Sequence, residues 1–225
     1  MAWNFSVQIN ALTGFDGNDT NASEEGENYS TLASQWLTDA AKEVIQVLPP
    51  HLKTKCSTMT AISHDTGMDL DEQEDVLYVV RQKTDGGIYI PCRKIPGENG
   101  AEAEDPDSLM YYATPTDPVY YIQSHTNDTL RLFTKPSPSS EQQAHVFHVS
   151  YPTISYNATE IDNFPNEAEH LVVLRAAITA LQHKMTYEED PELFLPILQS
   201  LRSQYHEGLQ VLVQGSLTSS QQGAK

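Results

Sequence analysis

Apolar residues recur at helical spacing near both ends of the chain, and the first such stretch covers residues 31–48. A helix cap is available at Ser30 or Thr31, and Pro49-Pro50 would end the helix. The apolar residues form one stripe along it: Leu32, Trp36, Leu37, Ala40, Ala41, Val44 and Leu48. Because a lone amphipathic helix does not persist in water, the stripe is predicted to pack on another helix.

Two further helices are predicted in the second half of the chain, over residues 164–185 and 191–213. The first has Glu167 and Glu169 in its first turn and Lys184 near its end, as the helix dipole favours. It is apolar on most sides, which is typical of a helix that contacts several neighbours. In the second, apolar residues repeat at intervals of three and four: Leu198, Leu201, Tyr205, Leu209 and Leu212.

Between these helices the pattern changes to short runs rich in Val, Ile, Tyr, Thr and Phe, separated by turn residues. The runs are CSTMTAIS, DVLYVVRQ, GIYIPCRK, PVYYIQSH, TLRLFTK and AHVFHVSY. Asp85-Gly86-Gly87 and Asn127-Asp128 would each join two strands in a hairpin, because these residues tolerate positive φ. Residues 96–108 and 135–143 are predicted to be loops, the first of them mobile.

The predicted fold class is α+β, a helical bundle with an inserted antiparallel β module that forms a β-sandwich or a curled sheet. The ranges are a flexible N-terminal arm (1–30), a bundle body (31–55 and 164–213), a β module (56–163) and a flexible C-terminal tail (214–225). The residues predicted to pack helices within or between subunits are Trp36, Leu37, Val44, Leu171, Leu174, Ile178, Leu181, Leu198, Leu201, Tyr205 and Leu209.

Charge narrows the possible partners. With 13 Lys and Arg against 31 Asp and Glu, the net charge is −18, so a surface that grips nucleic acid is not expected. No apolar run is long enough to span a bilayer, and MAWNFSVQIN lacks the basic and apolar regions of a signal peptide. We expect no membrane partner. Cys56 and Cys92 are expected to be reduced and partly buried, with pairing across neighbouring strands as the alternative.

The titratable residues offer few catalytic or metal-binding patterns. The acidic stretch 65–75 is the best cation candidate, but Gly67 precedes its carboxylates where a calcium loop needs the glycine among them, and a solvated acidic loop is the alternative. His145 and His148 should point to opposite faces of a strand, and His183 and His206 could face each other between helices. No HExxH, GxSxG, Walker or GxGxxG motif occurs, so we expect no enzymatic activity and no cofactor.

Two adjacent tyrosine pairs, Tyr111-Tyr112 and Tyr120-Tyr121, lie in or near predicted strands. In a strand one member of each pair faces the core and the other faces outward. An outward tyrosine could contact a neighbouring subunit, since tyrosine is enriched at interfaces.

The segments DPVYYIQSHTNDTLRLFTKP, HVFHVSYPTISY and IDNFPNEAEHLVVLRAAITALQ together resemble head-to-tail connector proteins of tailed bacteriophages, the adaptor or neck proteins below the portal. The resemblance covers roughly residues 117–182, about a third of the chain, and more loosely WLTDAAKEVIQVLPP. The acidic loop at 96–108 and the N-terminal arm have no counterpart in it.

The resemblance implies a virion structural protein, made in the host bacterial cytoplasm and located at the head–tail junction. Its copies would form a ring, of about twelve subunits, that binds the portal and the tail or nozzle proteins. Genomic DNA would pass through the acidic lumen without being held. The C-terminal tail would dock on the portal, with Leu217, Thr218 and Gln221 as candidate contacts.

Two other functions remain open. The β module could recognise a host receptor or glycan at the tail, with outward aromatic residues such as Tyr121 and Phe147 as the platform. A virion-borne peptidoglycan hydrolase that uses carboxylates is the least favoured, because nothing in the sequence positions a carboxylate pair in a cleft.

Overall fold

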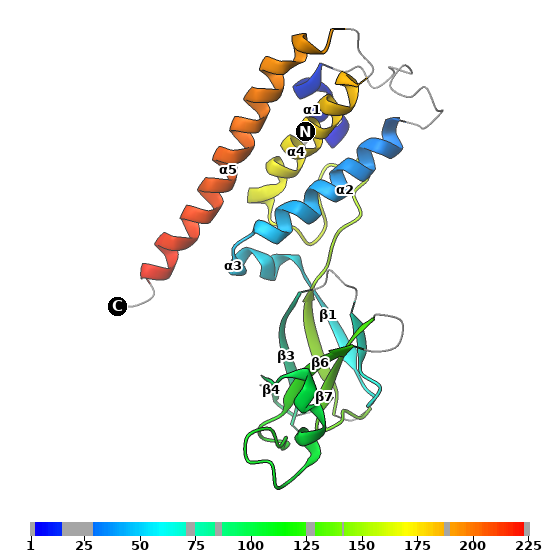
Figure 1. Ribbon diagram of the computed structural model, residues 1–225, viewed down its shortest axis with the longest axis vertical. Helices are drawn as coiled ribbons and strands as arrows, with labels where there is room; N and C mark the ends of the chain where they lie inside the picture. Colours follow the sequence, from blue (N-terminus) through cyan, green and yellow to red (C-terminus); the bar gives the residue numbers. More distant parts are fainter. Residues whose placement is uncertain are drawn as a thin grey trace. The chain divides into compact units, whose positions relative to one another are not determined.

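The computed structural model describes residues 3–14, 29–70, 75–83, 87–124, 129–140, 142–186 and 190–222. The chain divides into two compact units, which are described separately (Figure 1). The helical unit comprises Met1–Cys56 and Tyr151–Lys225, and the β unit is Ser57–Ser150. The predicted α+β fold class is confirmed, since one unit contains the long helices and the other contains the strands.

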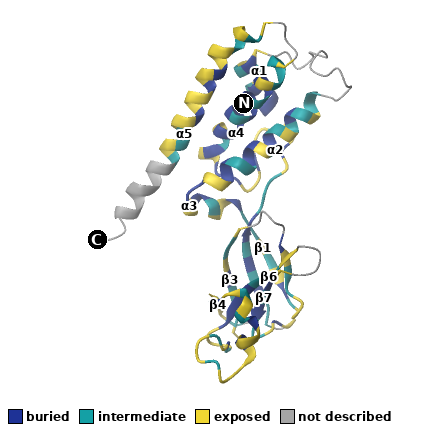
Figure 2. Cartoon of the chain, viewed as in Figure 1, coloured by how far each residue is buried: buried dark blue, intermediate teal, exposed yellow. Residues whose placement is uncertain are grey.

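Helix α4 (Asn166–Met185) is the central element of the helical unit. It contacts α1 (Phe5–Thr13), α2 (Tyr29–Val47) and α5 (Leu195–Gln222). Half of its residues are buried, as the dark colour of α4 in Figure 2 shows. The small side chains Ala176, Ala177 and Ala180 are among them, and small residues let neighbouring helices approach closely. The prediction that this helix is apolar on most sides because it has several neighbours is therefore correct.

The N-terminal arm predicted over residues 1–30 is wrong for its first part, because α1 lies there. The Asn4 side chain caps the helix by accepting a hydrogen bond from the Val7 amide (3.1 Å), and Gly14 ends it at φ 71°. Phe5 and Ile9, one helical turn apart, are buried. The arm was predicted from the polar residues that follow Gly14, whereas Phe5–Thr13 form a short amphipathic helix. Residues 15–28 of the arm lie outside the described residues.

The C-terminal tail predicted over residues 214–225 is also wrong in its backbone, because α5 continues to Gln222. The segment has no proline after Pro196, and serine and glutamine carry only small helix penalties, so a well-packed helix can extend through it. A short 3₁₀ turn, η5 (Pro191–Phe194), precedes the helix. The helix begins at Leu195, and Leu195-Pro196 is one of the two starts that the sequence allows, the other being Asp190-Pro191. After α2, the chain continues through α3 (Pro50–Lys53) and η2 (Thr54–Cys56).

Residues 151–163 were predicted to belong to the β module, but they lie in the helical unit. Hydroxyls on α2 satisfy their backbone: the Ile154 amide donates to Thr38 Oγ1 (3.1 Å) and the Tyr156 amide to Ser34 Oγ (2.9 Å). The Phe5 amide in turn donates to the Ala158 carbonyl (2.9 Å). This extended segment pairs with helices, an arrangement that strand-like composition does not predict.

The β unit contains two four-stranded sheets. The β1 sheet has the order β1 (Ser57–Ile62), β8 (Ala144–Val149), β3 (Val76–Gln82) and β4 (Tyr89–Pro91). The β2 sheet has the order β2 (Met68–Leu70), β7 (Leu130–Lys135), β6 (Val119–Ser124) and β5 (Arg93–Lys94). All neighbours are antiparallel except β5 and β6, which are parallel.

The predicted strands agree with these elements, with two differences. The run GIYIPCRK divides into β4 and β5, which belong to different sheets, and β2 was not predicted because it lies in the acidic stretch. The β3–β4 and β6–β7 pairs are antiparallel, as the hairpin prediction requires. Most of the residues predicted to form their turns, Asp85-Gly86 and Asn127-Asp128, lie outside the described residues.

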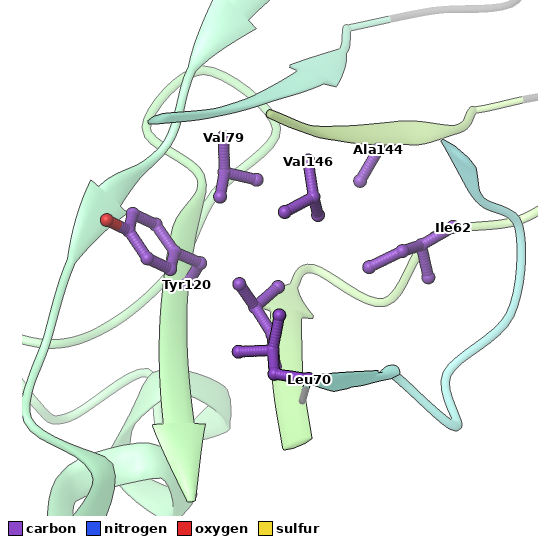
Figure 3. Packing of buried hydrophobic residues seen from close by; sticks show 7 residues of the cluster. Ile62, Leu70, Val79, Tyr120, Ala144 and Val146 are labelled. Atoms are coloured by element: carbon purple, nitrogen blue, oxygen red, sulfur yellow. The ribbon is translucent and has the colours of Figure 1, made fainter. Parts of the chain in front are cut away.

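One apolar core lies between the two sheets. Figure 3 shows side chains from both of them pointing into it: Ile62, Leu70, Val79, Tyr120, Ala144 and Val146. Leu132 belongs to the same core. Ala144 and Val146, the two members that share a strand, are two residues apart on β8, as alternation along a strand requires. This arrangement, two sheets around one shared core, corresponds to the sandwich form of the predicted module.

The loop predicted to be mobile over residues 96–108 is instead largely folded. Gly97–Glu104 form a 3₁₀ helix, η3, in which Gly100 and Ala103 are buried. An added Cβ at Gly100 would lie 2.6 Å from the Tyr121 ring, so only glycine permits this approach. The Gly, Glu and Asp content suggested disorder, but one glycine and one alanine in that composition are the residues that pack.

Candidate interaction surfaces

Most residues predicted to pack helices are used inside the chain itself. They are buried in the helical unit: Leu37, Val44, Leu171, Leu174, Ile178, Leu181, Leu198, Leu201 and Tyr205. They pack helices as expected, but they are not available to a second copy of the chain. Of the two alternatives predicted for these side chains, packing within the chain is the one that their burial supports.

Two of the predicted packing residues, Trp36 and Leu209, are only half-buried. The Trp36 ring lies edge-on to Tyr29, with centroids 6.0 Å apart, and 5.2 Å from the His183 ring. His183 therefore contacts α2, whereas its predicted partner, His206, lies on α5. The side chains of Leu217, Thr218 and Gln221, the candidate portal contacts, lie outside the described residues.

Close packing and charge define the contacts that α4 makes with α5 and α2. An added Cβ at Gly208 would lie 2.4 Å from Leu171 Cδ2, so this glycine lets α5 approach α4 closely. Arg175 Nε donates to Glu43 Oε2 (2.6 Å) and joins α4 to α2. Burial, with the Glu43 carboxylate nearby, raises the pKa of Tyr205 to about 12. These contacts indicate a packed interior rather than a reactive site.

The acidic stretch 65–75 is divided between β2 and a turn. The Asp69 carboxylate accepts hydrogen bonds from Arg131 Nε (2.5 Å) and Nη2 (2.9 Å), so its charge is paired across the strands. Gly67 adopts φ 74°, with the Leu132 carbonyl 2.5 Å from where its Cβ would lie. Residues 71–74 are outside the described part of the chain. Among the described residues, no group of three or more His, Cys, Asp or Glu is placed to hold a metal ion.

The strand histidines point to opposite faces of β8, as predicted. His148 is buried, with its Nε2 3.0 Å from Thr60 Oγ1, whereas His145 stacks on Tyr89 at the sheet surface. Both cysteines are free thiols. Burial raises the pKa of the Cys56 thiol to about 11 and that of Cys92 to about 12, so both are protonated and unreactive near neutral pH.

The strand register brings apolar side chains together on the outer face of the β1 sheet. Tyr78 and Phe147 are cross-strand partners whose rings stack with centroids 4.4 Å apart and 18° between planes. Met59, the partner of Phe147 on the other side, is 50% exposed, and Tyr78 is 46% exposed. By strand alternation the outward positions include Met59, Ala61, Tyr78, Val80, Tyr89, Pro91, His145 and Phe147, together with the polar Ser57 and Gln82 at strand ends.

None of these outward positions carries a lysine, arginine, aspartate or glutamate. We call them the aromatic face. Contiguous apolar surface of this kind is uncommon on an isolated soluble protein and marks contact sites.

The outer face of the β2 sheet has similar residues but is covered. Tyr121 and Phe133 stack there with centroids 5.4 Å apart, and Ile95, Ala103 and Ala113 pack over them. Tyr121 is therefore buried, and its proposed part in an outward binding platform is wrong. Tyr120 is buried as well, on the other side of the strand, because both faces of β6 are covered. In the pair Tyr111-Tyr112 the first ring is half-buried and the second is exposed, as predicted.

Comparison with known proteins identifies no relative that would assign a role to these surfaces. The chain matches no family model, and no curated protein matches it. Among the described helices, none is both long and apolar enough to cross a bilayer. The function is therefore inferred from the residues that these surfaces expose.

Proposed function

We propose that the chain is a structural subunit of the connector between the head and the tail of a tailed bacteriophage. Its copies form a ring, of about twelve subunits, that binds the portal on one side and the tail or nozzle proteins on the other. In this proposal the protein acts by binding other subunits and carries out no reaction. It is located in the virion neck, and genomic DNA passes through the ring.

The observation that carries the proposal is the aromatic face. A sheet that is packed on one side and bears uncharged apolar side chains on the other is suited to contact with another protein subunit. Tyrosine, phenylalanine and methionine are the residues enriched in the cores of such contacts, and lysine and glutamate are depleted there. The resemblance over residues 117–182 supports the assignment to a phage neck in particular.

The charge is compatible with this role. A net charge of −18 makes the protein unsuited to holding DNA, and an acidic lumen would let a duplex slide because it repels phosphate. Helix α5 also exposes single apolar side chains, Leu195, Ile197 and Val211, at separate places along its length.

The proposal is tested by mass photometry of the purified chain, alone and mixed with the portal protein of the same phage. We expect a closed ring, or a portal complex that gains about twelve copies of the chain. The variant Tyr78→Ser/Phe147→Ser should fail to assemble while keeping its circular dichroism spectrum, and Ser63→Ala is the matched surface control. A monodisperse monomer that binds neither portal nor tail proteins would refute the proposal.

A second candidate is a tail-associated module that recognises a host receptor or glycan. The stacked Tyr78 and Phe147 rings favour it, because exposed aromatic rings can bind the apolar faces of sugars. A glycan array separates the two functions, since binding that is lost in Tyr78→Ser would support recognition. The absence of any glycan signal, together with particle images that place the protein at the neck, would remove this candidate.

A further inference from the structure

A loop of the β unit, Asp105–Tyr112, carries the most exposed large apolar side chain of the described residues. Leu109 is fully exposed at its tip, and the adjacent Met110 is 72% exposed. Tyr112 is partly exposed beside them, whereas Tyr111 and Ala113 turn inward to the cluster over the β2 sheet. We call Leu109, Met110 and Tyr112 the apolar tip. Together these three side chains form a small contiguous apolar patch in water, and exposed patches of this kind mark contact sites.

The backbone around the apolar tip is fixed by hydrogen bonds. The Ser108 amide donates to the Asp105 carbonyl (3.0 Å), and the Tyr112 amide donates to the Ser108 carbonyl (3.2 Å). Arg93 Nη1 donates to the Met110 carbonyl (2.9 Å), which ties the tip to the sheet. At its base, the Ala113 amide donates to the Ala103 carbonyl (3.0 Å). The loop therefore presents its apolar side chains in one conformation, and little ordering entropy would be lost on binding.

Carboxylates surround the apolar tip. Two of them are neutralised within the chain, since Glu104 pairs with Lys135 and Asp117 with Arg93 (3.1 Å). The others are exposed, and no ion pair is found for them among the described residues: Glu102, Asp105 and Asp107. Asp105 Oδ1 accepts from the Asp107 amide (3.0 Å), and Glu102 Oε2 accepts from Ser108 Oγ (3.1 Å), so two of these carboxylates are held in place.

We propose that the apolar tip docks into an apolar pocket of a partner protein, and that lysine or arginine residues rim this pocket. Leu109 and Met110 fill the pocket, and the carboxylates of Glu102, Asp105 and Asp107 pair with the rim. Charge complementarity selects this occupant. A membrane is disfavoured because the carboxylates would meet anionic headgroups, and the same loop of a second copy is disfavoured because it carries the same carboxylates. The inference is independent of the phage assignment.

The test begins with site-specific photocrosslinking in the full chain. A photoreactive amino acid replaces Leu109 in one variant and Leu193 in the other, an equally apolar side chain that is 72% exposed on η5. Both variants are irradiated in a lysate of the cells that naturally produce the protein. The protein crosslinked from position 109 is identified, and the attachment site is mapped by mass spectrometry. It is then purified for binding measurements.

We expect position 109, and not 193, to crosslink to one protein at an apolar site bordered by lysine or arginine. The double variant Leu109→Ser/Met110→Ser should bind the purified partner at least about tenfold more weakly, whereas Leu193→Ser should bind normally. Asp105→Asn/Asp107→Asn should slow association and reduce its dependence on salt. Unchanged melting temperatures would show that the variants fold, as expected for side chains that lie outside the core.

Several outcomes would overturn the inference. One is a yield of crosslinked protein from position 109 that is no higher than from position 193. Another is a crosslink to a second copy of the chain, or to a site without basic residues. A third is Leu109-dependent flotation with vesicles of phosphatidylcholine and phosphatidylglycerol, which would indicate a membrane. A crosslinked partner that is neither a portal nor a tail protein would support the docking inference, and failure of the chain to form a ring or to bind the portal would refute the proposed function alone.

Discussion

The outer faces of the two sheets in the β unit have the same chemistry and different surroundings. On the β2 sheet, Tyr121 and Phe133 stack and are covered by the segment that contains η3 and Ala113. On the β1 sheet, Tyr78 and Phe147 stack in the same way, but Tyr78 remains 46% exposed. The Tyr121–Phe133 pair is therefore part of a second core, whereas the Tyr78–Phe147 pair lies at the surface.

This difference shows that the chain can cover an aromatic sheet face with its own residues. The covering segment includes a 3₁₀ helix whose buried glycine packs closely on the Tyr121 ring. Since no comparable segment of the described chain covers the β1 sheet, its aromatic face is better explained by contact with another molecule. The predictions below test whether the two faces differ in this way.

The largest effect is expected for Tyr121→Ala, on the covered face. This change removes a ring that stacks on Phe133 and contacts Gly100, and it leaves a cavity beneath η3. The free energy of unfolding of the β unit should fall by about 3–5 kcal/mol, as for other buried aromatic residues. Urea unfolding followed by circular dichroism measures it. A loss below about 1 kcal/mol would mean that η3 does not form a core with this sheet.

A smaller loss is expected for Gly100→Ala, which tests the cover from the other side. The added Cβ would lie 2.6 Å from the Tyr121 ring, so the ring or η3 must move. We expect a loss of about 1–3 kcal/mol in the same unfolding measurement. The exposed neighbour is the control, because Ala101→Ser should leave the stability unchanged. Equal stability of both variants would contradict the close contact between η3 and Tyr121.

Alkaline pH should lower the free energy of unfolding of the β unit through Cys92, which packs against the core between the two sheets. Burial raises the pKa of this thiol from 9.0 to about 12, so the unfolded chain ionises first as pH rises. Stability is therefore full below pH 9.0 and falls toward about pH 12, by at most about 1.4 kcal/mol per pH unit from this group. Urea unfolding at several pH values should show a shallower decline for Cys92→Ala than for the wild type. Parallel declines would show that the thiol is not buried in this core.

The smallest effect on stability is expected for Tyr78→Ser, on the aromatic face. The substitution removes a ring that is already half in water and that stacks on one partner, so the free energy of unfolding should fall by at most about 1 kcal/mol. Assembly measured by mass photometry should nevertheless be lost. The comparison with Tyr121→Ala is the sharpest test, because a stability loss of equal size at both positions would mean that the two faces are alike.

Local sequence patterns determined much of the fold. Helical periodicity predicted α2, α4 and most of α5, and alternation with turn residues predicted six of the strand runs. The patterns succeeded there because each element buries a continuous stripe or face. They failed where few residues pack, as for Phe5 and Ile9 in α1 and for Gly100 in η3. Such short elements depend on contacts with distant segments.

The candidate surfaces were less predictable than the elements. The sequence singled out Phe147, but Met59 and Tyr78 join it only through the registers of β1 and β3 on β8. It also suggested Tyr121 as an outward residue, and nothing local to β6 shows that η3 covers it. The apolar tip was hidden in a segment whose acidic composition predicted a mobile loop.

The sequence by itself determined the α+β class, the order of the helices and strands other than α1 and β2, and the burial of the stripes on α2 and α4. The tertiary structure alone decided which aromatic face is covered, which strand belongs to which sheet, and that residues 151–163 pair with helices. The physical reason is that periodicity records which side of an element is apolar. It does not record what that side meets, because the partner is brought there by residues far away in the chain.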